Sequence, residues 1–139
     1  MTPADLIAKL PPSIRIGPHD FRLEKLNCHA ANVRGIWGEC AIQEFTIRVQ
    51  ENIPRSIKAV DTLIHEINHA IWWAYKLDDE DKQERIVATM ATGWTQVYRD
   101  NPWLIDWIRE AIAPDHEASL LHLAAPHHAG GTGARNDVA

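Results

Sequence analysis

The sequence predicts a single α+β domain in which a small antiparallel or mixed sheet is followed by a helical core. The chain has 139 residues, 45% hydrophobic and 24% charged, which suits one globular domain of ordinary composition. Short segments with alternating apolar residues occupy the first fifty positions. Apolar residues then recur at intervals of three and four. Strands first and helices after them are typical of the α+β class.

The N-terminal half begins with a short helix and continues with short strands. The helix is expected over residues 4–10, because Pro11 and Pro12 stop it. The alternating segments predicted as strands are IRIG, DFRLEKL, GIWGECAI and EFTIRVQ, and the segments GPHD, NCHAANVRG and QE between them are expected to be turns. The glycines and polar residues around GIWGECAI favour an irregular strand at the edge of the sheet.

Three helices are expected after Pro54. The first runs to about Leu77, and its apolar stripe consists of Ile57, Val60, Ile64, Ile67 and Ile71. The second covers roughly residues 80–99, with an apolar face predicted at Val87, Met90, Ala91, Trp94, Val97 and Tyr98. The third begins near Asn101 and stops near Pro114.

Composition and charge exclude several classes of function. The net charge is −5 and the Lys and Arg residues are scattered, so nucleic acid is not an expected partner. No apolar run approaches the roughly 20 residues that span a bilayer, and the N-terminus lacks the pattern of a secretory leader. We therefore expect a cytoplasmic protein without a membrane partner. Cys28 and Cys40 are expected to be reduced thiols, because two cysteines make no disulfide framework.

The stretch TLIHEINHAIWW, residues 62–73, carries the pattern of a zinc site. His65 and His69 are four residues apart on the first long helix, about 40° around its axis and about 6 Å along it, so both imidazoles can reach one ion. Glu66 is rotated by about 100° from His65, where its carboxylate can reach a water on that ion and act as a general base. The surrounding residues are apolar, and burying these groups there without partners would cost roughly several kcal/mol. Zn²⁺ is therefore the expected cofactor.

A catalytic zinc site normally has three protein ligands, so the chain should offer a third. Glu84 shares a helical face with Val87, Ala88, Ala91 and Trp94, and is expected to point toward the core. Glu80 and Asp81 are the main rivals, followed by His116 and His122.

The segments TLIHEINHAIWW and ERIVATMATGWTQVYRDNP resemble small zincin-like metallopeptidases of the gluzincin type. In these proteins H-E-x-x-H lies on one helix and a glutamate on the next. The nearest resemblance is to compact phage- and prophage-encoded proteins in the neighbourhood of the ImmA/IrrE and SprT-like peptidases. The similarity covers roughly residues 35–102. The H-E-x-x-H motif is fairly specific, whereas the E-R-I-V part is much weaker.

The resemblance implies a minimal zincin-like fold and a set of residue roles. His65 and His69 would bind zinc, Glu66 would be the catalytic base, and Glu84 would complete the site. The metallopeptidase domain would span residues 1–115. Residues 116–139 are expected to be a largely flexible extension for a different reason, since the end of the chain is rich in Gly, Ala and polar residues and has no apolar period. The partner would be a peptide or protein substrate, paired as an extended strand with EFTIRVQ, whose substrate-binding residues would be Phe45, Ile47 and Val49.

One departure from the family pattern leaves a second hypothesis open. Many relatives have a His or Tyr that stabilises the oxyanion, and neither Tyr75 nor Tyr98 has the helical position for it. The leading hypothesis is a zinc-dependent hydrolase of peptide bonds. The alternative is a zinc-stabilised, non-catalytic accessory or structural protein of a phage or prophage.

Overall fold

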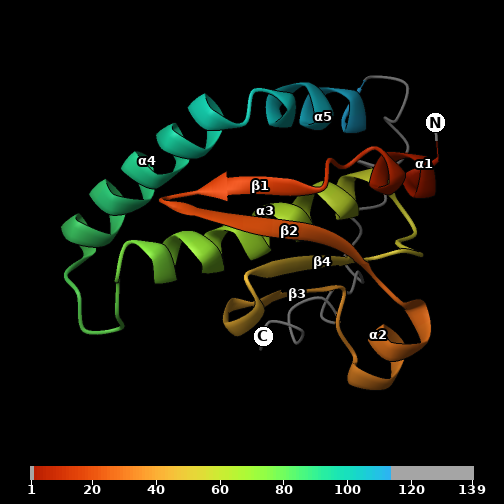
Figure 1. Cartoon of the computed structure of the whole chain (residues 1–139), viewed down its shortest axis with the longest axis horizontal. Coiled ribbons are helices and arrows are strands. Elements are labelled where there is room, and N and C mark those ends of the chain that lie inside the picture. The colour runs from red at the N-terminus through yellow and green to blue at the C-terminus, as the bar shows by residue number, and fades with distance from the viewer. Residues whose placement is uncertain (1, 114–139) are drawn as a thin grey trace, which may run out of the picture.

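A computed structural model describes residues 2–113, which form a four-stranded mixed sheet and five helices (Figure 1). The predicted α+β class is confirmed. The elements, in chain order, are α1 (Pro3–Ala8), β1 (Ser13–Ile16), β2 (His19–Leu26), α2 (Cys28–Arg34), β3 (Gly38–Ala41), a 3-10 turn (Ile42–Glu44), β4 (Thr46–Gln50), α3 (Ser56–Ala74), α4 (Gln83–Asp100) and α5 (Trp103–Ala111). Within this part of the chain no helix is long and apolar enough to cross a membrane. The extension predicted at 116–139 lies outside the described residues.

The sheet has the strand order β1-β2-β4-β3, so β1 and β3 are its outer strands. The pairs β1–β2 and β3–β4 are antiparallel, whereas β2 and β4 are parallel. Gly17, with φ of 59°, lies in the tight β1–β2 turn and adopts the left-handed conformation that glycine accepts without strain. All four strands lie in the segments where alternation predicts them, and β3 is the edge strand that the glycines of GIWGECAI indicate.

Helix α3 packs across one face of the sheet, and the main core lies between them (Figure 1). The fully buried residues of this core include Ile14 and Ile16 of β1, Phe21 of β2, Ile47 and Val49 of β4, and Leu63, Ile67, Ala70 and Ile71 of α3. The period of three and four in the sequence therefore marks the buried face of α3 correctly. The helices α4 and α5 lie on the β1 side of the molecule, and α2 lies at its other side, near β3.

The opposite face of the sheet carries a row of charged side chains. Glu39 of β3, Arg48 of β4 and Glu24 of β2 are direct cross-strand neighbours. Arg48 donates to Glu39 at 2.7 Å and to Glu24 at 3.1 Å, and Arg34 at the end of α2 donates to the second oxygen of Glu39 at 2.7 Å. This ionic row joins β3 to the rest of the sheet through side chains.

The predicted turn NCHAANVRG is wrong, because it contains helix α2. The side chain of Asn27 accepts hydrogen bonds from the backbone N–H groups of His29 and Ala30 and so caps the helix. Gly35 ends it in the left-handed conformation, with φ of 70°. Two turns of helix are too short for an apolar period to appear in the sequence, whereas both caps are visible there.

Helix α4 buries part of the predicted apolar face: Val97 is buried, and Met90, Trp94 and Tyr98 pack half-buried against the core. Its buried residues are Gly93, Gln96 and Val97, whereas Val87 is 55% exposed and Ala88 and Ala91 are exposed as well. A Cβ atom added at Gly93 would lie 2.5 Å from Cγ2 of Ile71, so the glycine permits a close approach of α4 to α3. The apolar pattern of the sequence does not report this contact.

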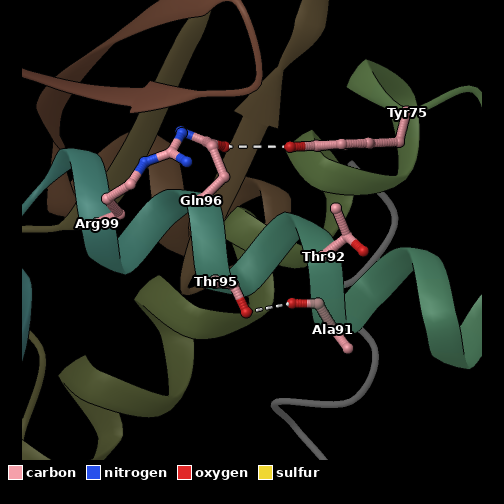
Figure 2. Close-up of a pocket in the computed structure, with 6 residues that line it drawn as sticks. All are labelled: Tyr75, Ala91, Thr92, Thr95, Gln96 and Arg99. Carbon is pink, nitrogen blue, oxygen red and sulfur yellow. Dashed lines mark hydrogen bonds between the residues drawn. The ribbon is translucent and has the colours of Figure 1, made fainter.

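The buried side chain of Gln96 has hydrogen-bond partners for both its amide oxygen and its amide nitrogen. Its Oε1 accepts from the N–H of Gly17 at 2.6 Å, and its Nε2 donates to the carbonyl of Arg15 at 3.2 Å and to Asp100 at 2.9 Å. The hydroxyl of Tyr75 donates to the same Oε1 at 3.4 Å (Figure 2). These bonds join α4 to the β1–β2 hairpin and to the end of α3.

The Gly93→Ala variant is expected to be less stable than the wild type, although alanine is the better helix former by roughly 1 kcal/mol. The new methyl group would lie 2.5 Å from Ile71, and such overpacking costs about 1–3 kcal/mol. Urea denaturation measures the free energy of unfolding. Thr92→Ala, at the exposed neighbouring position of α4, is the control and should change it by about 0.5 kcal/mol or less. A Gly93→Ala protein more stable than the wild type would contradict this packing.

The Glu39→Gln variant is expected to weaken the dependence of stability on acid. Burial alone would raise the pKa of Glu39, but hydrogen bonds from Arg48 and Arg34 outweigh it and hold the pKa below the ordinary 4.5. A carboxylate with a lowered pKa stabilises the fold above the unfolded-state value, and this stabilisation is lost as the pH falls below about 4.5. Urea midpoints between pH 7 and pH 3 should therefore fall less steeply for the variant. Glu110→Gln, in the exposed pair with Lys9, is the control, and identical slopes for wild type and Glu39→Gln would refute the expectation.

Candidate metal centre

Helix α3 carries the three polar residues that the sequence singles out. His65 and His69 lie one turn apart and are half-buried, and Glu66 is buried, with 2% of its surface exposed. One nitrogen of each imidazole and one carboxylate oxygen all lie within 4.8 Å of one another. Among the described residues this is the group of histidine, cysteine and acidic side chains that could hold a metal ion.

The two imidazoles have the separation that a tetrahedral ion requires. Their Nε2 atoms are 3.2 Å apart, and the rings meet at 74° with centroids 4.9 Å apart. Two nitrogen ligands about 2.05 Å from a tetrahedral zinc ion lie about 3.3 Å from each other. At this distance one Nε2–H can donate to the other Nε2, with the roles set by the tautomers of the two rings. The same two atoms can bind a zinc ion without a change in the backbone of α3.

Glu66 lies on the flank of the histidine pair that faces strand β3. A Cβ atom added at Gly38 would lie 3.3 Å from Oε2 of Glu66, so the strand passes close to the carboxylate. Cys40, two residues further along β3, is buried and reduced. Burial, followed by the charges of Glu66 and Glu39, raises the pKa of the Cys40 thiol to about 12. At neutral pH the thiol is therefore uncharged.

A cavity of about 500 Å³ opens on the other flank of the histidine pair. It is lined by His65, Asn68 and His69, by Trp72 and Asp79, and by Met90 of α4. The cavity gives the imidazoles a route to solvent and leaves room for a ligand. A second cavity, of about 450 Å³, shares Trp72 with the first and is lined in addition by His19, Trp73, Ala74, Lys76 and Leu77.

An aromatic group lies at the second cavity. The rings of His19, Phe45 and Trp73 lie 4.9–5.6 Å from one another, centroid to centroid, and Phe21 lies behind them. Phe45 and Trp73 are 38% and 39% exposed, which is high for residues of their size. Phe45 lies just before β4, with φ of 49°, and no local pattern of the sequence indicates this aromatic group.

The predicted orientation of Glu84 is wrong. Its side chain is exposed in the first turn of α4, on the face opposite Gly93, because nine helical residues correspond to about 180°. Glu84 is not a member of the group formed by His65, Glu66 and His69. Of its rivals, Glu80 is exposed, whereas Asp81 accepts hydrogen bonds from the N–H of Asp78 and from Arg85. The other two rivals, His116 and His122, lie outside the described residues.

The predicted substrate strand is also wrong. The segment EFTIRVQ contains β4, which is paired with β2 on one side and with β3 on the other and has no free edge. Ile47 and Val49 are 0% and 1% exposed and belong to the core under α3. Of the three predicted substrate-binding residues only Phe45 has a substantially exposed side chain.

A third cavity, of about 430 Å³, lies between the end of α3 and α4, lined by residues that Figure 2 draws. Its polar groups are used within the fold: Tyr75 bonds Gln96, Thr95 donates to the carbonyl of Ala91 at 2.8 Å, and Arg99 pairs with Asp100 at 2.9 Å. Tyr75 is therefore held in this cavity and not in the one that His65 and His69 line.

The comparisons with known proteins give no relative. No family model matches the sequence, and no curated protein and no solved structure is significantly similar to it. A function can therefore be inferred only from the residues of this chain.

The structure adds residues that the motif alone does not name. Asn68, Trp72, Asp79 and Met90 line the cavity beside the histidines. The signal for Asn68 is in the sequence, since it is the polar residue between Glu66 and His69 in an otherwise apolar segment. The contributions of Asp79 and Met90 depend on the tertiary contact of α4 and its preceding loop with α3, which no local pattern reveals.

Proposed function

We propose that the protein is a cytoplasmic zinc-dependent peptidase that hydrolyses peptide bonds with a water activated by Glu66. The observation that carries this proposal is the 3.2 Å separation of the His65 and His69 Nε2 atoms, with the Glu66 carboxylate in the same group. The adjoining cavity of about 500 Å³ supports it, because a substrate must reach the histidines.

The donor set suits zinc and the chemistry suits hydrolysis. Imidazole nitrogens are preferred zinc ligands, and an ion bound by them would polarise a carbonyl group and lower the pKa of a bound water to about 7. Glu66 would take a proton from this water while the water oxygen forms a bond to the carbonyl carbon. When the C–N bond breaks, Glu66 would return the proton to the departing nitrogen. The burial of Glu66 keeps bulk water from competing for that proton.

The sheet suggests where a peptide would lie. A strand can be added only at an outer strand, and β3 is the outer strand beside Glu66. We therefore propose β3 in place of β4 as the strand that pairs with the substrate. The close approach of Gly38 to Glu66 would bring the paired backbone near the base.

Glu84 remains our proposed third ligand. Its carboxylate makes no hydrogen bond or ion pair with the described residues, whereas the Asp81 carboxylate is already bonded to Arg85 and to the N–H of Asp78. Glu84 also lies in the first turn of α4, at the end of the loop that carries Asp79 of the cavity. A change of its side-chain rotamer and of that loop would be needed to bring it to the ion.

Replacement of Glu66 by glutamine is expected to slow hydrolysis strongly and to leave zinc bound. General-base catalysis contributes about 10²–10⁴-fold, so cleavage of a fluorogenic peptide library should fall by that factor. Elemental analysis should find one zinc per chain in the wild type and in Glu66→Gln. A His65→Ala, His69→Ala double variant should contain none. His29→Ala, which removes an exposed imidazole of α2, is the matched control and should keep both zinc and activity.

Two results would reject the proposal in different ways. A wild type without zinc would remove the metal centre altogether. A wild type that binds zinc, requires His65 for thermal stability and cleaves no peptide would favour the alternative, a zinc-stabilised accessory or structural protein.

Replacement of Glu84 by glutamine is expected to weaken zinc binding more than Glu80→Gln or Asp81→Asn. Loss of a direct ligand should exceed the roughly 10–100-fold cost of losing an outer hydrogen-bond partner. Competition with a chromophoric chelator measures the affinity. Equal affinities for the three variants would exclude Glu84 and leave His116→Ala and His122→Ala as the next variants to compare.

A further inference from the structure

Asn68 occupies a distinctive position relative to the predicted zinc ligands. On helix α3 it is rotated by about −60° from His65, whereas His69 is rotated by about +40° and Glu66 by about +100°. The amide and the carboxylate therefore flank the histidine pair on opposite sides. Asn68 lines the same cavity as both histidines, and Glu66 faces β3.

Trp94 of α4 fixes the orientation of the Asn68 amide. Its indole Nε1 donates a hydrogen bond of 2.8 Å to Oδ1 of Asn68. An indole N–H can only donate, so the atom that it contacts must be the oxygen of the amide. The indole is itself held in place, because it is half-buried and packs on the ring of Tyr98 at 5.3 Å.

The other arm of the amide, the NH₂ group, is available to a ligand. Nδ2 of Asn68 makes no hydrogen bond with the described residues. A buried nitrogen in this situation would be a buried polar atom without a partner, and Nδ2 of Asn68 is not one of those atoms. It is therefore accessible, on a side chain that lines the cavity. With its oxygen oriented toward Trp94, Asn68 has two N–H donors left for a ligand.

A donor at this place meets a need of the proposed reaction. Attack of water on a peptide carbonyl places negative charge on the carbonyl oxygen, and one well-placed donor there is worth about 10²–10³-fold in rate. Neither tyrosine lines the cavity of the histidine pair: Tyr75 bonds Gln96, and the Tyr98 ring packs on Trp94. His19 belongs to the aromatic group of the second cavity.

We propose that Asn68, held by Trp94, donates a hydrogen bond to the carbonyl oxygen of the scissile peptide bond and stabilises the charge that develops there. This inference rests on the proposed peptidase function. Asn68 acts as a catalytic residue because it touches the substrate, and Trp94 acts as a positioning residue through it. The proton balance of the reaction is unchanged, because Asn68 donates a hydrogen bond and transfers no proton.

The Asn68→Asp variant separates this role from a purely structural one. Aspartate keeps the size of the side chain and an oxygen that accepts from Trp94, so the contact between α3 and α4 is retained. It replaces the NH₂ donor by a second oxygen, which repels the developing charge. We expect kcat to fall about 10²–10³-fold while KM stays within about threefold and the melting temperature is nearly unchanged.

The Asn68→Ala and Trp94→Phe variants complete the set. Asn68→Ala removes the donor without adding charge and should lower kcat to a similar extent. Trp94→Phe keeps an aromatic ring and removes the indole donor, so it should lower kcat less than Asn68→Ala does. In the Asn68→Ala background, Trp94→Phe should cause no further loss of kcat. Zinc content is measured in every variant, so that a lost metal is not mistaken for a lost hydrogen bond.

A binding measurement provides a readout that is independent of turnover. A phosphonamidate peptide carries a tetrahedral anion in place of the scissile bond, and its dissociation constant with the zinc-loaded protein can be measured by calorimetry. Asn68→Ala should weaken its binding by about the same factor as kcat/KM, whereas binding of a cleavage-product peptide should change much less.

The outcomes distinguish this inference from the proposed function. Cleavage by the wild type together with Asn68→Asp and Asn68→Ala rates within about threefold of it would overturn the role of Asn68 and leave the peptidase intact. A zinc-loaded wild type that cleaves nothing would overturn both.

Discussion

The close packing of α3 against strand β3 is the constraint on which the candidate site depends. A Cβ atom at Gly38 would lie 2.7 Å from Cγ2 of Thr62 and 2.9 Å from the carbonyl oxygen of Arg48, so only glycine fits between the helix and the sheet. Thr62 and Glu66 lie one turn apart on this side of α3 and are both buried. A larger residue at position 38 would separate helix and strand and would carry Glu66 away from β3.

The opposite side of α3 is defined by a second glycine, Gly93 of α4, which lies against Ile71. The sequence does not reveal this contact, but it predicts the features that belong to α3 alone. The period of Leu63, Ile67 and Ile71 identifies the helix and its core face, and the spacing of His65 and His69 identifies the metal pair. Those features are local, so one segment of sequence contains them.

The predictions that failed concern features that are set only by the packing of one helix or strand against another. The apolar residues of α4 favour burial at Val87 as well as at Val97, but the backbone approach at Gly93 and the four hydrogen bonds of Gln96 bury the side of Val97 and leave Val87 exposed. Glu84 lies on the side of α4 opposite Gly93 and is therefore exposed. Strand order is likewise absent from a local pattern: β4 follows β3 in the chain and pairs with it, yet it also pairs in parallel with β2, which makes it a central strand.

The outer face of the sheet is physically coupled to the candidate site through β3. This strand has four residues, and successive side chains point to opposite faces of the sheet. Glu39 points to the ionic row with Arg48 and Arg34, while Gly38 and Cys40 lie on the side of Glu66. A short strand owes little to its own backbone pairing, so the side-chain bonds of Glu39 help to set where Gly38 lies against α3. Protonation of Glu39 would therefore loosen the strand that confines Glu66 before it disturbed the histidine pair, whose residues belong to α3 and not to β3.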